Sequence, residues 1–353
     1  MNPPIMHIAG RAIGAGHPPY VIAELSGNHN GSLESAMQLL EAVKQAGADA
    51  VKLQTYTADT ITIDCDAPEF RIQGGLWDGY TLYRLYQQAH TPWAWHAPLF
   101  ARARALGLTL FSSPFDFTAV DFLEELRTPA YKIASFELVD LPLIRKVAAT
   151  GKPMILSTGM ANLEEIRAAV DAAKGGGCRE MALLHCVSGY PTPPEECHLR
   201  TLGALADSFP EIVTGLSDHT LETTVPVAAV ALGAGIIEKH VTLRRSDGGP
   251  DAAFSLQPEE LRAVCQGCRT AWSALGRGGW ERKPSEAGNV IFRRSLYVVA
   301  DVAAGEMFTA ANVRSIRPGH GLAPGCYPEI LGKKASRPIA RGTPLAWSLV
   351  AGE

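Results

Sequence analysis

The chain has 353 residues, with 32 Lys and Arg against 36 Asp and Glu, and its formal net charge is −4. That balance excludes a basic protein that wraps nucleic acid, and the 46% hydrophobic share excludes intrinsic disorder. No uncharged apolar run reaches the roughly 20 residues that cross a bilayer, and the first residues do not resemble a signal peptide. We therefore expect no nucleic-acid partner and no membrane partner. Seven scattered cysteines suit a reducing compartment, so we expect a cytoplasmic protein.

Short β-branched apolar runs alternate with amphipathic stretches along the first 275 residues or so. Continuous apolar runs between helices are typical of parallel strands that are buried on both faces. Eight such units predict an α/β fold, a (β/α)8 TIM barrel. A doubly wound sheet is the alternative, but the first strand leads into ELSGNHNGS, which lacks its glycine-rich phosphate turn. The predicted strands are 20–25, 50–55, 108–113, 130–135, 153–158, 181–186, 212–217 and 235–240.

The composition changes near residue 275, where GRGGWERKPSEAGN reads as a linker. Short apolar runs broken by turns follow it, which predicts a small β-rich module. We expect a barrel domain over residues 1–280 and a second domain over 281–353. Cys265 and Cys268 form a CxxC inside a helical pattern. We interpret them as two packed thiols, with a redox or metal role as the alternative, because no second pair has matching spacing.

Polar side chains stand at the carboxyl end of every predicted strand, where a TIM barrel carries its active site. Lys52 and Lys132 end two different strands, and together with hydroxyl groups they suit a ligand that bears phosphate or carboxylate. The alternative is that each lysine extends to solvent on its own. The other candidates at these ends are Glu24, Gln54, Ser113, Ser135, Ser157, Ser188 and Ser217.

Two histidines end consecutive strands. Adjacent strands lie about 4.8 Å apart, so the imidazoles of His219 and His240 can reach one divalent ion. Two imidazoles with oxygen ligands suit Mn²⁺, Fe²⁺, Co²⁺ or Zn²⁺. The alternative is that each histidine is a structural hydrogen-bond donor. The residues alone leave the ion open.

An ordered set of motifs resembles a known family. The segments ELSGNHNGS, AGADAVKLQTY, FSSPFD, YKIASFE, LSTGMA, GLSDHT and ALGAGIIEKHVTL follow one another in the chain. Together they resemble the sialic acid synthase family, which condenses phosphoenolpyruvate with an amino-sugar. The segments GLWDGYTLYRLYQQAHTPWAWH and RSDGGPDAAFSLQPEE are similar to the pseudaminic acid branch of that family. The resemblance runs from about Tyr20 to Leu349.

The resemblance implies a TIM barrel followed by a small antifreeze-like (SAF) domain, in a domain-swapped homodimer. It implies a divalent metal bound by His219 and His240. Mn²⁺ is the favoured ion, and Mg²⁺ and Co²⁺ are the alternatives. Glu24 would be the catalytic carboxylate, and Asp251 and Arg317 would contact the sugar, although Arg317 also reads as a turn residue before Pro318. Ser188 departs from the family pattern, because some relatives carry Asn at this position, where the side chain would contact the phosphate. The implied phosphoenolpyruvate ligands are Lys52, Ser113, Lys132, Ser135, Ser157 and Ser217.

The activity that the resemblance implies is synthesis of pseudaminic acid and phosphate from phosphoenolpyruvate and 2,4-diacetamido-2,4,6-trideoxy-β-L-altropyranose, with metal assistance and C–O cleavage. Synthesis of N-acetylneuraminate or legionaminic acid is the alternative within the family. A Schiff-base pyruvate aldolase, with Lys52 or Lys132 as its amine, is a more distant one. A tail that binds ice or a partner is disfavoured, because charges such as Arg314 and Lys333 interrupt it.

Overall fold

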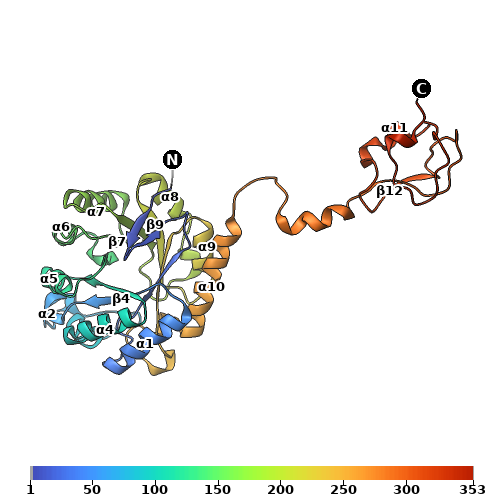
Figure 1. Cartoon of the computed structure of the whole chain (residues 1–353). Helices are drawn as coiled ribbons and strands as arrows, with labels where there is room; N and C mark the ends of the chain where they lie inside the picture. Colours follow the sequence, from blue (N-terminus) through green and yellow to red (C-terminus); the bar gives the residue numbers. More distant parts are fainter. Residues whose placement is uncertain (1–2, 353) are drawn as a thin grey trace. The chain divides into compact units, whose positions relative to one another are not determined.

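The computed structural model describes residues 3–352 and divides the chain into two compact units, Met1–Gly276 and Arg277–Glu353 (Figure 1). The division falls at the beginning of the glycine-rich segment that the composition marks. Each unit has its own apolar core, so the two are described separately.

The first unit is a closed barrel of eight parallel strands, as the alternation of apolar runs predicts. The strands close in the order β10-β3-β4-β5-β6-β7-β8-β9, with β10 paired to both β9 and β3. They are β3 Tyr20–Glu24, β4 Ala50–Thr55, β5 Thr109–Pro114, β6 Tyr131–Ile133, β7 Met154–Ser157, β8 Met181–Cys186, β9 Val213–Asp218 and β10 Ile236–His240. The (β/α)8 prediction is confirmed, and a doubly wound sheet is excluded.

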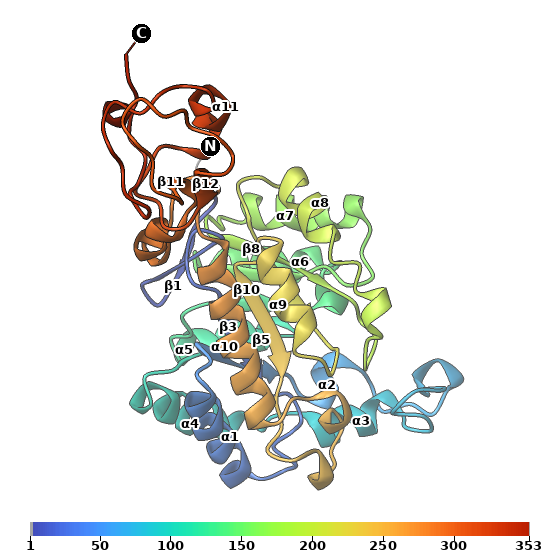
Figure 2. The same cartoon turned by 90° about the vertical axis from the view of Figure 1, so that its right-hand side faces the viewer.

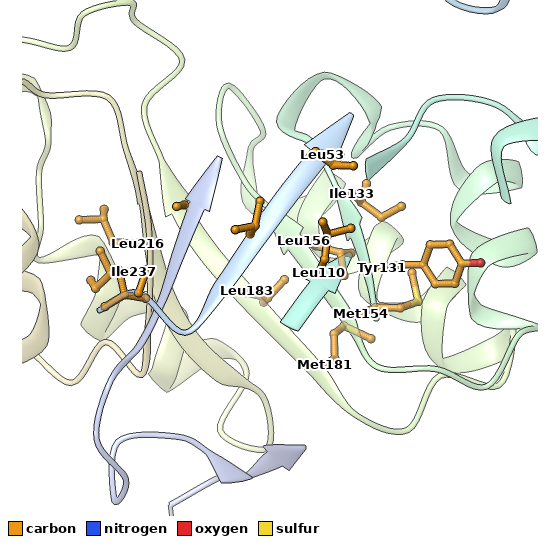
Figure 3. Close-up of a cluster of buried hydrophobic side chains, with 14 of the residues drawn as sticks. Leu53, Leu110, Tyr131, Ile133, Met154, Leu156, Met181, Leu183, Leu216 and Ile237 are labelled. Atoms are coloured by element: carbon orange, nitrogen blue, oxygen red, sulfur yellow. The ribbon is translucent and has the colours of Figure 1, made fainter. Parts of the chain in front are cut away.

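Side chains alternate between two cores along each strand, because successive residues point to opposite faces. In β4, Val51 and Leu53 face outward into the layer between barrel and helices, while Ala50 lies in the inner core. Figure 3 shows the outward set, including Leu110, Ile133 and Leu156. The inner core is small. Lys52 lies two residues after Ala50 in β4, so its side chain also faces inward. The barrel interior therefore becomes polar toward the carboxyl ends of the strands.

Ten α-helices of the described residues surround the barrel (Figures 1 and 2). The first, α1, begins at the Ser32 cap, whose hydroxyl accepts from the Ser35 backbone N–H, and ends at Gly47 with a φ of 90°. The last, α10, packs against both α1 and α9, which closes the ring. Their bounds are α1 Leu33–Ala46, α2 Ala58–Ile61, α3 Leu82–Ala89, α4 Trp93–Ala105, α5 Phe117–Glu125, α6 Leu141–Ala148, α7 Leu163–Gly175, α8 Thr201–Ser208, α9 Thr224–Ala231 and α10 Pro258–Leu275.

A hairpin that the sequence did not predict precedes the barrel. Strands β1 (Met6–Ile8) and β2 (Arg11–Ile13) pair antiparallel. Met6, Ile8 and Ile13 are buried in the same cluster as the inward-facing residues of the barrel strands. The hairpin therefore extends the inner core. Three-residue runs are too short to stand out by periodicity, which is why this element was missed.

The second unit is small and largely irregular. Its one strand pair is β11 (Ser295–Val298) with β12 (Val313–Ile316), antiparallel, and its short helix is α11 (Tyr327–Ile330). Isolated bridges extend the strand character, for example Val302 with Ile339. Leu296, Phe308 and Ile330 are among the residues that form its core. Across residues 3–352, none of the helices combines the length and the apolar character that a bilayer crossing requires.

Candidate active site

Charged side chains are buried inside the barrel toward the carboxyl ends of its strands. Lys52 and Lys132 are only 4% and 2% exposed. This overturns the alternative in which each lysine extends to solvent. Two carboxylates, Glu24 and Glu238, are buried beside them. Buried charges are costly unless paired, so this group must be arranged as a network.

Glu238 is the centre of that network. Its Oε1 accepts from Lys132 Nζ at 3.1 Å and from Ser217 Oγ at 3.3 Å, and it lies 3.2 Å from Lys52 Nζ. Lys52 Nζ also contacts Glu24 Oε2, because Glu24 and Lys52 are register partners on neighbouring strands. Two cations and two anions therefore share one enclosed space. Sequence reasoning assigned no role to Glu238.

The pKa shifts follow from this arrangement. Burial raises the pKa of Glu238, but Lys132 and Lys52 lower it further, to about 2. Burial raises the pKa of Glu24 by more than Lys52 lowers it. Burial lowers the pKa of Lys52, yet the two carboxylates raise it above its usual value, whereas for Lys132 burial prevails and the pKa falls. Glu238 is thus the fixed anion of the site, and Glu24 is the carboxyl that can hold a proton.

Several buried serine hydroxyls lie at or just after the carboxyl ends of the barrel strands. Among the described residues, the Oγ atoms of Ser157 and Ser188 are buried and have no hydrogen-bond partner. Ser113 Oγ accepts from Lys52 Nζ at 3.5 Å, and Ser135 Oγ accepts from the Gly159 backbone N–H at 3.2 Å. A Cβ at Gly159 would lie 2.4 Å from Ser188 Oγ and 2.7 Å from Ser135 Oγ, so only glycine leaves this hydroxyl cluster open. Buried hydroxyls without a partner are available to an anionic ligand.

His219 and His240 lie together, with ring centroids 5.3 Å apart. The Nδ1–H of His219 donates to the Val187 carbonyl at 2.9 Å, which leaves Nε2 with a lone pair. His240 Nδ1 is buried without a partner among residues 3–352. Burial, together with the charge of His219, lowers the pKa of His240 well below its usual value, so that ring is neutral. For His219, contact with Cys186 outweighs burial and raises the pKa.

This donor set fits a divalent ion that takes two neutral imidazole nitrogens from the protein. Within residues 3–352, no group of three or more His, Cys, Asp and Glu side chains is placed to hold an ion. Oxygen atoms of water and substrate would complete the coordination of such an ion. A site with open positions of this kind is typical of catalytic metals.

A cavity of about 450 Å³ opens beside the imidazoles. His240, Gln54 and Asp251 supply polar lining, and Tyr56 and Phe254 are among its apolar lining residues. Ser26 Oγ donates to Asp251 Oδ2 and accepts from Gln54 Nε2 at 3.2 Å. Burial raises the pKa of Asp251. The predicted sugar contact Asp251 and the strand-end candidate Gln54 thus face a cavity large enough for a sugar.

Sequence reasoning missed Glu137 altogether. It ends the 3₁₀ turn Ser135–Glu137 and lines the same cavity, and its Oε2 is buried with no partner in the described part of the chain. Burial raises its pKa to about 7. The available signal was an acidic residue in the YKIASFE segment, directly after a strand.

Two further predicted features lie elsewhere. Arg317 belongs to the second unit, directly after β12, and is exposed there. Its role as a sugar contact stays a prediction. Cys265 and Cys268 are buried and free in α10, and burial raises the pKa of both to about 12. Two inert packed thiols agree with the interpretation of the CxxC as structural.

Residues 39–279 match the NeuB family, and residues 293–351 match the SAF domain. The chain belongs to the NeuB family. It is 45% identical to a pseudaminic acid synthase of Campylobacter jejuni, over 92% of this chain and 95% of that one. It is 36% identical to an N,N'-diacetyllegionaminic acid synthase of Legionella pneumophila, over 93% of each chain.

A solved structure supports the same membership. N-acetylneuraminic acid (sialic acid) synthetase from Leptospira borgpetersenii, in complex with citrate, superposes with a TM-score of 0.73 at 30% identity. The match covers 82% of this chain and 95% of that one. The resemblance of the NeuB-family chain to sialic acid synthases is therefore confirmed, as are its barrel and SAF domain.

Proposed function

We propose that the protein is a phosphoenolpyruvate-dependent pseudaminic acid synthase. The observation that carries the proposal is a buried cluster of Lys52, Lys132 and serine hydroxyls without a partner among the described residues. It lies in the same barrel mouth as the paired imidazoles of His219 and His240. The substrate follows from the relatives: identity to the pseudaminic acid synthase is 45%, against 36% for the legionaminic acid synthase. The same two comparisons keep legionaminic acid synthesis as the second candidate.

Phosphoenolpyruvate would bind at the two buried lysines. Lys52 and Lys132 neutralise its phosphate and carboxylate, since each ammonium is already held in position by Glu238. The hydroxyls of Ser157 and Ser188 donate to the anion, because neither has another partner in residues 3–352. The assigned anion ligands are completed by Ser113, Ser135 and Ser217. Positioning of this kind supplies up to about 7–11 kcal/mol in well-oriented systems.

The proposed reaction forms a C–C bond between the two substrates and a C–O bond to water, and it breaks the C–O bond to phosphate. C3 of phosphoenolpyruvate attacks C1 of the open-chain sugar, whose carbonyl oxygen takes up a proton. Water adds to the electron-poor C2 and loses a proton, and the resulting hemiketal phosphate releases inorganic phosphate by C–O cleavage. Glu24 is the assigned carboxylate for the proton of that water, because its contact with Lys52 holds it at the anion site and burial raises its pKa.

His219 and His240 would hold the divalent ion, which we propose is Mn²⁺, with Mg²⁺ or Co²⁺ as alternatives. When bound, the ion supplies Lewis-acid polarisation of the sugar aldehyde. The protein contributes the orientation of the rings: the Val187 carbonyl fixes the tautomer of His219, and Phe254 packs against His240 at a centroid distance of 5.0 Å.

We also propose a cytoplasmic, domain-swapped homodimer in which Arg317 of one chain contacts the sugar bound by another. Phe136, Val139 and Met160 follow β6 and β7 and are exposed by 58%, 60% and 63%, an apolar group at the mouth that a partner would cover. Mixing inactive Arg317→Ala and His219→Ala chains after dissociation should restore activity, because one mouth of each mixed dimer is intact. No recovery would contradict the swap.

The reaction itself is tested with phosphoenolpyruvate labelled with ¹⁸O in the C–O–P bridge and three sugars. These are 2,4-diacetamido-2,4,6-trideoxy-L-altrose, N-acetylmannosamine and the legionaminic acid precursor. We expect the trideoxy-altrose to give the highest kcat/KM and the label to leave in the phosphate. A pyruvate adduct trapped by borohydride, with activity indifferent to EDTA, would instead identify a Schiff-base aldolase.

A further inference from the structure

A small hairpin between α2 and α3 carries Trp77, a half-buried side chain that lines the cavity. The segment that joins these helices is drawn in light blue in Figure 2. Ile72 N–H donates to the Tyr80 carbonyl at 2.9 Å, and Gly79 N–H donates to the Ile72 carbonyl at 3.1 Å. From 73 to 80 every residue is exposed except Trp77, which is half-buried. Trp77 and Ile72, at the start of the hairpin, are therefore its two half-buried apolar side chains, and both line the cavity at the barrel mouth.

Trp77 is anchored at the barrel mouth. Its Nε1–H donates to the Pro250 carbonyl at 2.8 Å, directly before Asp251. Its ring lies 5.7 Å from Tyr190 and 6.4 Å from Phe254, centroid to centroid. Tyr190 in turn lies 4.4 Å from His219. The indole is thus the outer part of an aromatic wall that leads to the imidazole pair.

The aromatic wall and the polar side chains that are candidates for binding the sugar line the same cavity. The space of about 450 Å³ has Gln54 and Asp251 among its polar lining residues, and Trp77, Tyr190 and Phe254 among its apolar ones. A second space of about 210 Å³ is lined by Trp77 and Leu76 but does not reach Gln54 or Asp251. The indole therefore lies between the two spaces and limits the size of the first.

We propose that Trp77 is the specificity-determining residue for the sugar, and that its indole packs against the methyl-bearing substituents at C4 and C6. This inference rests on the proposed function and extends it to a single side chain. A 2,4-diacetamido-2,4,6-trideoxy sugar carries an acetamido group on C4 and has a methyl group as C6, whereas N-acetylmannosamine carries a hydroxyl group on each of these carbons. One methyl group in an apolar pocket is worth roughly 10- to 200-fold in kcat/KM.

The experiment measures kcat/KM for both sugars with full-length wild type, Trp77→Ala, Trp77→Phe and a control, Leu76→Ala. Leu76 shares the hairpin and lines only the smaller space. In Trp77→Ala, kcat/KM for the trideoxy sugar should fall at least about 10-fold, while the value for N-acetylmannosamine changes less than about threefold. The KM for phosphoenolpyruvate should not change. Trp77→Phe keeps an apolar ring without the Pro250 anchor and should show a smaller loss of selectivity. Leu76→Ala should behave as wild type.

Equal losses for the two sugars in Trp77→Ala, or unchanged selectivity, would overturn the role of Trp77 while leaving the proposed function intact. If Trp77→Ala does not fold, as judged by thermal unfolding, an unchanged selectivity in Trp77→Phe has the same force. Failure of wild type to turn over the trideoxy sugar would overturn the proposed function, and with it the inference that depends on it.

Discussion

Replacing Glu238 by Gln removes the anion that holds both lysines and keeps the volume of the side chain. Lys132 has Glu238 as its one carboxylate partner among the described residues, whereas Lys52 retains Glu24. Removing one partner of a buried ion pair costs about 3–5 kcal/mol, because the remaining charge is left uncompensated. A pKa of Glu238 lowered from 4.5 to about 2 corresponds to about 3 kcal/mol. The two estimates agree in size.

Differential scanning calorimetry of the full chain, without added anions at pH 7, measures this loss. We expect the midpoint of the barrel transition to fall by roughly 5–15 °C. Saturating phosphoenolpyruvate should recover part of the loss, by about 2.7 kcal/mol at 100 times its Kd, because a new anion reaches the lysines. Since the pKa of Glu238 is depressed, its contribution in wild type is present above pH 4.5 and is lost as the pH falls toward 2.

Glu260→Gln is the matched control. Its pair with Arg245 is about one third exposed on both sides, so its loss should cost at most about 1 kcal/mol. If Glu238→Gln is no less stable than this control, the account of Glu238 as the fixed anion of the site is wrong.

Three further outcomes are expected. His219→Ala should abolish turnover and leave the thermal midpoint close to that of wild type; full activity of a metal-stripped His219→Ala chain would refute the metal assignment. Gly159→Ala should raise the KM for phosphoenolpyruvate at least about 10-fold, because its Cβ enters the space between Ser135 and Ser188, and an unchanged KM in steady-state assays would count against the anion site. Because burial raises the pKa of Glu137 to about 7, wild type should lose stability as the pH rises from 4.5 to 7, and Glu137→Gln should lose less; parallel urea-denaturation curves would contradict this.

The strands and the lysines could be read from the sequence because both depend on local pattern. Eight apolar runs of six residues mark the barrel, and period-2 alternation places Lys52 inside it. The two histidines follow from the ends of consecutive strands. These features require only short-range information.

The central role of Glu238 could not be read in the same way. It depends on the closure of the barrel, which brings β4 and β6 within reach of β10 although neither is its neighbour in the sheet. Glu137 depends on a 3₁₀ turn that directs its carboxyl into the cavity. Trp77 depends on a hydrogen bond to Pro250, 173 residues further along the chain. Each of these residues acquires its position from contacts far apart in the sequence.

The most direct test of the account is anomalous scattering at the manganese edge, from crystals soaked with Mn²⁺ and phosphoenolpyruvate. We predict one peak at the imidazoles of His219 and His240 and phosphoenolpyruvate density on Lys52 and Lys132. A peak away from both imidazoles, or the phosphorylated acid bound outside the barrel mouth, would contradict the proposed carbon–carbon bond formation at this site.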